Sequence, residues 1–395
     1  MTSITLPKGQ NSLERYNLSS PGYGGYRPSR SFTRQVYAAA HVVVDPAAET
    51  DPWTANPALD WEATMAYRRH LWSMGFKVAE AMDTSQRGMG LDWPSALELI
   101  GRSLEAARDV PGADLASGAG TDHLTDHLTD FSDLTLDDVR RAFIEQIEAV
   151  EKLGGRIILM ASRALAAVAT GPDDYLKIYG ELIDGCREPV ILHWLGEVFD
   201  PALAGYWGSA QIDACADTVL SIIQANPPKV EGIKVSLLEK RYEIDLRKRL
   251  PEGVLMYTGD DFDYPELMAG DDTHFSHGLL GIFDAIAPVA AQGLERLAAG
   301  DTAGFLEILE PTVPLARKIF EAPTQFYKSG VVFLAWLNGH QDHFTLVAGL
   351  QSARSIRHYG EVFRLADRAG LLQDPDLAAR RMAQLLAVYG IEADA

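Results

Sequence analysis

The sequence is poor in cysteine, in basic charge and in long apolar runs. Two cysteines in 395 residues, Cys186 and Cys215, argue against a disulfide framework, and no C-x-x-C metal signature is present. Basic residues number 35 against 55 acidic ones, a net charge of −20, which argues against nucleic acid or an anionic membrane as a partner. The run Val331–Leu337 is too short to span a bilayer, and residues 1–17 lack the apolar core of a secretory signal. We therefore expect a cytoplasmic protein.

Nucleotide-binding motifs are absent too. No G-x-G-x-x-G follows a predicted strand and no G-x-x-x-x-G-K-[S/T] occurs, so a nucleotide-binding fold has no support. What the chain has is 47% hydrophobic residues, enough for a large core. Short apolar runs alternate with amphipathic stretches, and the runs predict eight strands. These are Arg34–Asp45, Gly75–Met82, Ala113–Gly118, Arg156–Met160, Pro189–Trp194, Val230–Lys234, Gly253–Tyr257 and Thr273–Ser276.

The eightfold alternation favours an α/β fold, a (β/α)8 TIM barrel, over a doubly wound sheet, although alternation alone does not separate the two. After Gly300 the pattern is only helical. We predict an irregular N-terminal arm over residues 1–31, a barrel over 32–300 and a C-terminal helical extension over 301–395. Two interpretations of the arm stay open: it packs on the barrel or on a neighbouring subunit, or it is a terminus without fixed contacts.

The stretch from Val230 to Asp261 holds the first candidate for chemistry. Two apolar runs flank a charged connection, which is the pattern of a strand, a crossover and a second strand in a parallel sheet. Lys234 ends the first run, and active sites of barrels gather at the carboxyl ends of their strands. The alternative is a surface lysine that begins a loop.

Four motifs resemble the dihydrodipicolinate synthase / N-acetylneuraminate lyase family of class I aldolases. Gly232-Ile-Lys234 resembles its G-I-K, and Thr258-Gly-Asp-Asp261 its S-G-x-D-like turn; Met82–Leu91 resembles its G-T-T-G-E loop, and Gly270–Ser276 its G-x-x-G-x-I-S. The resemblance implies that Lys234 forms a Schiff base with a 2-oxo acid. It also implies that Thr84 and Ser85 bind the substrate carboxylate, although both are equally suited to capping the turn.

The chain departs from that family at three positions. The tyrosine that moves protons at the iminium is replaced by His193, whose imidazole titrates near neutrality and is suited to the same task, unless it is a hydrogen-bonded core residue. Ala161 and Ser162 stand where a second tyrosine is expected. Val198 replaces the arginine that binds a second carboxylate, so we expect a neutral, sugar-derived substrate tail rather than lysine biosynthesis.

The sequence thus predicts a Schiff-base lyase, an aldolase or dehydratase, that acts on a 2-oxo acid without a cofactor or metal and forms a homo-oligomer, a dimer or tetramer. Two alternatives stay open: a metal-dependent lyase or isomerase and a non-catalytic sensor of 2-oxo acids. The candidate metal ligands at the strand ends are Glu80, His193, His274 and His277. The repeat at residues 121–130 is a polar loop or a histidine metal site. Further substrate-binding candidates at strand ends are Glu80, Asp260 and Ser276. Other strand-end residues are Asp83, Arg163, Ser236, Asp261, His274 and His277.

Overall fold

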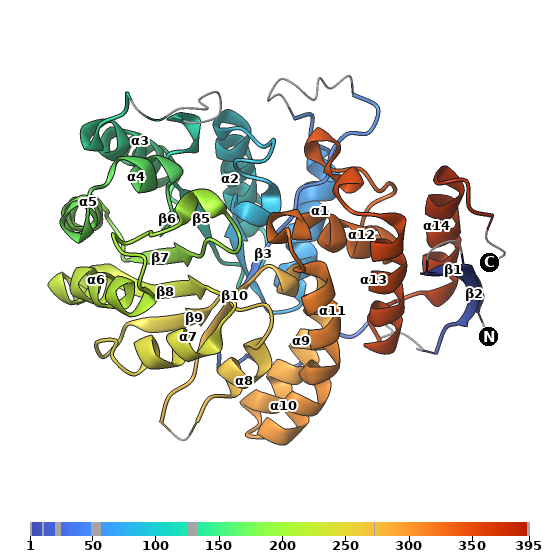
Figure 1. The fold of residues 1–395 in the computed structure, drawn as a ribbon. Coiled ribbons are helices and arrows are strands. Elements are labelled where there is room, and N and C mark those ends of the chain that lie inside the picture. Colours follow the sequence, from blue (N-terminus) through green and yellow to red (C-terminus); the bar gives the residue numbers. More distant parts are fainter. Residues whose placement is uncertain are drawn as a thin grey trace.

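A computed structural model describes residues 2–9, 12–19, 25–48, 57–124, 131, 133–271 and 273–392. Eight parallel strands form a closed barrel in chain order, with β10 pairing back onto β3 (Figure 1). The predicted TIM barrel is confirmed. Its strands are β3 (Val36–Ala39), β4 (Lys77–Glu80), β5 (Leu115–Ala119), β6 (Arg156–Leu159), β7 (Val190–Leu195), β8 (Val230–Ser236), β9 (Leu255–Thr258) and β10 (His277–Leu280).

Helices surround this barrel and continue beyond it along the chain (Figure 1). The ring elements are α1 (Trp61–Ser73), α2 (Trp93–Arg108), α3 (Leu136–Lys152), α4 (Arg163–Val168), α5 (Pro172–Gly185), α6 (Ile212–Ala225), α7 (Lys240–Arg247), α8 (Tyr264–Ala269) and α9 (Ile282–Ala298). The C-terminal helices are α10 (Thr302–Leu309), α11 (Val313–Ile319), α12 (Lys328–Leu337), α13 (Ile356–Arg368) and α14 (Pro375–Val388). No helix among the described residues is long and apolar enough to cross a membrane.

The faces of the strands follow the two-residue alternation of extended chain. Ala79 and Ile191 belong to the apolar cluster that fills the barrel interior. Ile191 pairs with Gly232, and His193 pairs with Lys234 two residues on. His193 and Lys234 therefore share the inner face, whereas Glu80, next to Ala79, points outward.

The last barrel strand lies four residues later than we predicted. The structure forms β10 at His277–Leu280 rather than at Thr273–Ser276. The carboxylate of Asp271 accepts hydrogen bonds from the backbone N–H of Thr273 and His274, which holds that segment as a turn. The carboxyl ends of the barrel strands together form the barrel mouth. Ser276 precedes β10 and therefore lies at the opposite, amino end of that strand.

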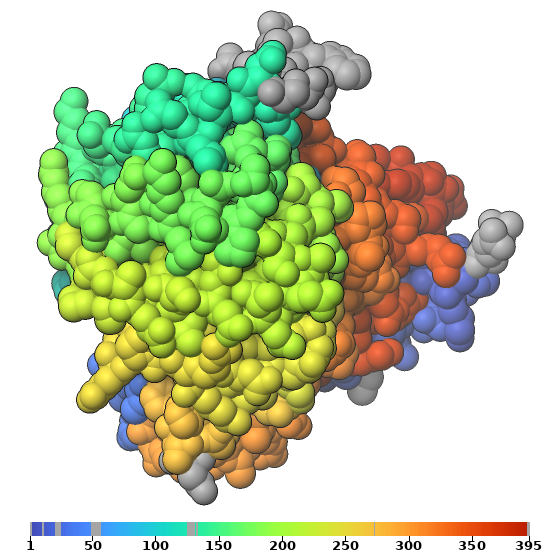
Figure 2. All heavy atoms as spheres, turned by 60° about the vertical axis from the view of Figure 1, so that its left-hand side comes forward, coloured from blue at the N-terminus to red at the C-terminus, as the bar shows by residue number. Residues whose placement is uncertain are grey.

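The N-terminal segment, which we expected to be irregular, contains an antiparallel hairpin. Strand β1 (Ser3–Gly9) pairs with β2 (Ser12–Asn17). Ile4 and Leu6 alternate with polar residues and are fully buried. The hairpin lies against the C-terminal helices, which Figure 2 shows as blue atoms beside red ones. A hydrogen bond of 2.7 Å from Tyr16 to Asp367 on α13 fastens it there.

Candidate active site

Lys234 lies inside the barrel, two residues before the carboxyl end of β8. Its side chain is 7% exposed. Gly259, just past β9, provides the space for it, because a Cβ at that position would lie 2.8 Å from Lys234 Cε and 2.1 Å from Ser236 Oγ. Any residue other than glycine at position 259 would therefore have to displace the side chain of Lys234.

The surroundings of Lys234 favour its neutral amine. Burial lowers the pKa of the ammonium, and the charges of Asp83 and Asp261 oppose that effect. A lowered pKa increases the fraction of lysine that carries a free electron pair near neutral pH. The amine is thus suited to attack a carbonyl carbon.

His193 is the neighbour of Lys234 on the adjacent strand β7. It is fully buried, and neither ring nitrogen hydrogen-bonds to any residue that the structure describes. Burial lowers the pKa of His193 well below its usual value, and the charge of Lys234 lowers it further. The imidazole is therefore neutral at physiological pH, so our expectation that it titrates near neutrality is wrong. Its ring nitrogens are still without a described partner and one can accept a proton.

Two carboxylates follow β9, and they lie in different surroundings. Asp260 Oδ1 accepts hydrogen bonds from the backbone N–H of Phe262 and Asp263, so it stabilises its own turn. Asp261 accepts one from Ile282 at the start of α9 and acts electrostatically on Lys234. Burial raises the pKa of Asp261 to about 7, an effect that Lys234 opposes. Burial also raises the pKa of Asp260, to about 6, but of the two only Asp261 acts on Lys234, so Asp261 is the carboxyl group of this turn that is suited to proton exchange there.

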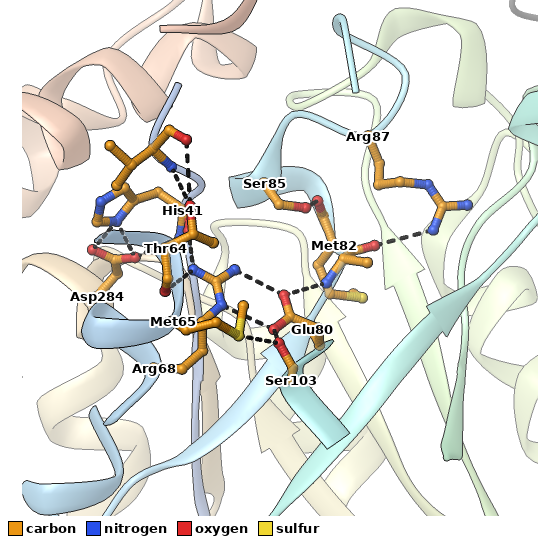
Figure 3. Close-up of polar contacts among 12 residues, drawn as sticks. His41, Thr64, Met65, Arg68, Glu80, Met82, Ser85, Arg87, Ser103 and Asp284 are labelled. Atoms are coloured by element: carbon orange, nitrogen blue, oxygen red, sulfur yellow. Dashed lines mark hydrogen bonds and ion pairs between the residues drawn. The ribbon is translucent and has the colours of Figure 1, made fainter. Parts of the chain in front are cut away.

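Thr84 and Ser85 lie in the short helix after β4, at the barrel mouth. The Thr84 hydroxyl shares a 2.7 Å hydrogen bond with the hydroxyl of Tyr327. The Ser85 hydroxyl donates to the carbonyl of Met82 at 2.7 Å, which is the turn-capping role that was the alternative for this residue (Figure 3). Both hydroxyls thus have protein partners, and Thr84 is held by a residue from the C-terminal helical part.

Glu80 ends β4, but its side chain points toward the surrounding helices and not into the barrel mouth, where we expected it to bind substrate. Its carboxylate receives two hydrogen bonds from the Arg68 guanidinium, at 2.8 and 2.9 Å, and one from Ser103 at 2.5 Å (Figure 3). All three side chains are fully buried between the barrel and helices α1 and α2. Ser276 is likewise engaged elsewhere, since its hydroxyl donates to Glu243 on α7 at 2.6 Å. Both residues support the packing of helices on the barrel.

The Arg68–Glu80 pair gives a stability prediction. We expect Glu80→Gln to lower the free energy of unfolding by about 3–5 kcal/mol, because the guanidinium would remain buried without its counterion. The measurement is urea unfolding. The control is Glu98→Gln, which removes the half-exposed pair between Glu98 and Arg102, and we expect it to cost less than about 1 kcal/mol. Equal losses in the two variants would contradict the prediction.

The residues proposed for a metal site are not brought together. Among the residues that the structure describes, no group of three or more His, Cys, Asp or Glu is placed to hold a metal ion. His274 lies in the loop before β10, and His277 opens the strand at its amino end. In the tandem repeat, Asp122 pairs with Arg87, while Asp126 and His127 lie outside the described residues.

A cavity of about 80 Å³ opens at the mouth between the ends of β4, β5, β6 and β7. Its wall combines carboxylates and guanidinium groups. Two ion pairs contribute to it, Arg87 with Asp122 and Arg163 with Asp200. The lining residues are Asp83, Arg87, Gly88, Gly120, Thr121, Asp122, Met160, Ala161, Ser162, Arg163, Leu195, Asp200 and Leu203.

The C-terminal helical part contributes two residues that we did not predict. Tyr327 and Lys328 lie where a short helical turn passes into α12, and both are 4% exposed. The Tyr327 ring stacks on Phe320, with centroids 4.3 Å apart, and bonds Thr84. No local pattern marked these residues, because their contacts at the barrel mouth, Thr84 and Met89, lie more than 200 positions earlier in the chain.

Several known proteins are similar to this chain. It is 32% identical over 114 residues to a 4-hydroxy-tetrahydrodipicolinate synthase of Laribacter hongkongensis, a match that covers 29% of this chain and only 37% of the relative. Among solved structures, YagE of Escherichia coli K12, a prophage protein of the dihydrodipicolinic acid synthase family in complex with pyruvate, has a TM-score of 0.66 at 12% identity. That likeness covers 86% of this chain and 99% of YagE.

A dihydrodipicolinate synthase from Acinetobacter baumannii, complexed with pyruvate, has a TM-score of 0.60 at 15% identity, covering 86% of this chain and all of the other. At these identities the likeness establishes the fold, and the barrel that the Gly-Ile-Lys resemblance implied is confirmed. One family model matches nearly the whole length, residues 4–391. The chain therefore belongs to the family described as "Protein of unknown function (DUF993)", with a barrel fold like that of dihydrodipicolinate synthases.

Proposed function

We propose that the protein is a Schiff-base-forming lyase, an aldolase or dehydratase, that acts on a 2-oxo acid through Lys234. The observation that carries the proposal is the burial of Lys234 at the barrel mouth, beside a neutral imidazole and an acidic group whose pKa is raised to about 7. Two structurally similar proteins were solved with pyruvate, the simplest 2-oxo acid. Trapping of the adduct with borohydride tests the proposal.

The reaction begins with the free amine of Lys234. Its nitrogen attacks the carbonyl carbon. The carbonyl oxygen takes one proton from that nitrogen and a second from a donor and leaves as water, so that an iminium remains. Cleavage of a C–C bond, or removal of a proton beside the iminium carbon, then sends an electron pair into the iminium and forms an enamine. In a C–C cleavage the hydroxyl of the departing carbon gives up its proton and leaves as a carbonyl, and a proton then adds to the enamine carbon. In a dehydration the enamine expels a neighbouring hydroxyl group, which takes up a proton and leaves as water. Hydrolysis of the iminium then releases the product and restores the amine.

The protons of these steps need acceptors and donors next to Lys234. His193 is neutral and has free ring nitrogens among the described contacts, so it is suited to take a proton from the substrate. Asp261 exchanges between its two forms near pH 7 and is suited to protonate the departing oxygen. Thr84, Ser85 and Asp260 remain proposed substrate contacts. The hydroxyl of Thr84, which shares a hydrogen bond with Tyr327, is the group of Thr84 that we propose for this contact.

The finer parts of the proposal come from the sequence. They are a sugar-derived substrate, assembly as a dimer or tetramer, and a cytoplasmic location. The departures at His193 and Val198 from the pattern of dihydrodipicolinate synthases support a substrate other than an intermediate of lysine biosynthesis.

A further inference from the structure

Lys328 is a buried lysine with few partners. Its side chain is 4% exposed, and its Nζ donates to the carbonyl of Gln325 at 3.0 Å and lies 3.2 Å from Met89 Sδ. The ammonium also lies 4.8 Å from the centre of the Tyr327 ring. No carboxylate of a described residue forms an ion pair with it. A buried ammonium with one carbonyl, a sulfur and a ring as partners retains unmet capacity to donate hydrogen bonds.

This lysine lies against the loop that follows β4 and borders the barrel mouth, because its Nζ contacts Met89. Met89 follows directly on Gly88, which lines the cavity. Burial lowers the pKa of Lys328 to about 8; the cavity residues Asp83 and Asp200 oppose that effect, and Arg163 adds to it. The charges that act on Lys328 are therefore those of the cavity wall. Asp83 also acts on Lys234, so one carboxylate is shared between the two buried lysines.

Arg163 is a cation of the cavity wall itself. Its Nε donates to Asp200 at 2.5 Å, and the side chain is 44% exposed. The two terminal nitrogens have no protein partner in the described part of the chain, so their N–H groups are available. Arg163 lines the cavity and Lys328 lies against the loop that borders it, and two neighbouring cations whose charges oppose each other are stabilised when an anion binds between them.

We infer that Lys328 and Arg163 form an anion-binding subsite that holds a carboxylate or phosphate at the far end of the substrate. The inference rests on the proposed function and names its substrate class: a 2-oxo acid with a second anionic group. It revises the neutral tail that we expected from Val198. The cations come from the start of α4 and from α12 instead of from the loop after β7.

A matched pair of 2-oxo acids tests this subsite. 2-Oxoglutarate and 2-oxopentanoate have the same carbon chain and differ in the terminal carboxylate. We expect half-saturation of the borohydride-trapped adduct at about 10- to 100-fold lower concentration for 2-oxoglutarate, the scale of a charge-assisted contact. A 2-oxo-3-deoxy-6-phosphohexonate, compared with its unphosphorylated form, distinguishes phosphate from carboxylate.

Variants assign the preference to the lysine. Lys328→Met is expected to reduce the ratio between the two acids to near one, and Lys328→Arg to keep most of it. The control Lys318→Met removes a lysine on α11 that pairs with Glu321, and it should keep the ratio. The preference should also weaken as the pH rises through about 8, because Lys328 then loses its charge.

The outcomes separate this inference from the proposed function. Two results would overturn the subsite and leave the Schiff base intact. One is adduct formation without a preference for either anionic acid, and the other is a preference that Lys328→Met retains. Absence of any adduct counts against the lyase. Calorimetry of 2-oxoglutarate binding then still decides the subsite: binding that Lys328→Met abolishes supports it, and no binding to the unaltered protein overturns it.

Discussion

Replacement of Lys234 by alanine is expected to abolish the covalent adduct with a 2-oxo acid and to lower turnover by at least about 10³-fold, the scale seen when a nucleophile is removed. The physical reason is that the alanine side chain has no nitrogen to attack the carbonyl. Lys234→Arg should fail as well, because guanidinium stays protonated. The protein is incubated with pyruvate and a panel of sugar-derived 2-oxo acids, reduced with borohydride, and its intact mass is measured.

The control for this prediction is Lys240→Ala. Lys240 is an exposed lysine on α7 that pairs with Glu266, and its loss should leave the adduct in place. Peptide mapping must also locate the added mass on Lys234. An adduct that persists in Lys234→Ala contradicts the assignment, and activity that a chelator removes without any adduct favours the metal-dependent alternative.

A strand was predictable where both of its faces are buried, because its sequence is then a continuous run of apolar residues. β6 to β9 were found within two residues because Ile157, Ile191 and Met256 stand in such runs. The last strand was misplaced because the likeness of Gly270–Ser276 to a family motif was preferred over the apolar run Gly278–Leu280. The hairpin at the N-terminus was missed because only two of its residues are apolar and fully buried.

The candidate site was predictable only where it lies on barrel strands. Lys234 and His193 were candidates because of their positions at strand ends and the resemblance to class I aldolases, and the structure pairs them on neighbouring strands. Glu80 was misassigned because the predicted strand did not say which of Ala79 and Glu80 faces inward, and a one-residue shift reverses the face. Lys328 could not be predicted from the sequence, because its position beside the barrel mouth depends on how the C-terminal helices pack.

The shared hydroxyl bond between Thr84 and Tyr327 links the C-terminal helices to the barrel mouth. The aromatic contacts of Tyr327 with Phe320 and Phe199 add to that link, and Phe199 belongs to the loop after β7. The extension therefore contributes to the wall of the site.

His193→Phe is expected to keep the fold and the Schiff base but to lower proton transfer by roughly 10²- to 10⁴-fold. The reason is that phenylalanine fills the buried space of the imidazole without a nitrogen to accept a proton. Exchange of the methyl protons of pyruvate in D2O, followed by NMR, measures this step directly, since the enamine takes up solvent deuterium. The assay needs no knowledge of the natural substrate.

The variant that best isolates the role of His193 is His193→Tyr, because it returns the residue type that the resemblance places at this strand end and should recover part of the exchange. The matched control is His277→Phe, which alters a buried histidine at the amino end of β10 whose Nδ1 accepts a hydrogen bond from Gln35. That change should affect stability and leave exchange intact. Unaltered exchange in His193→Phe, with the adduct present, would make His193 a packing residue. The proton would then have to pass through Asp261, the remaining group beside Lys234 with a pKa near 7.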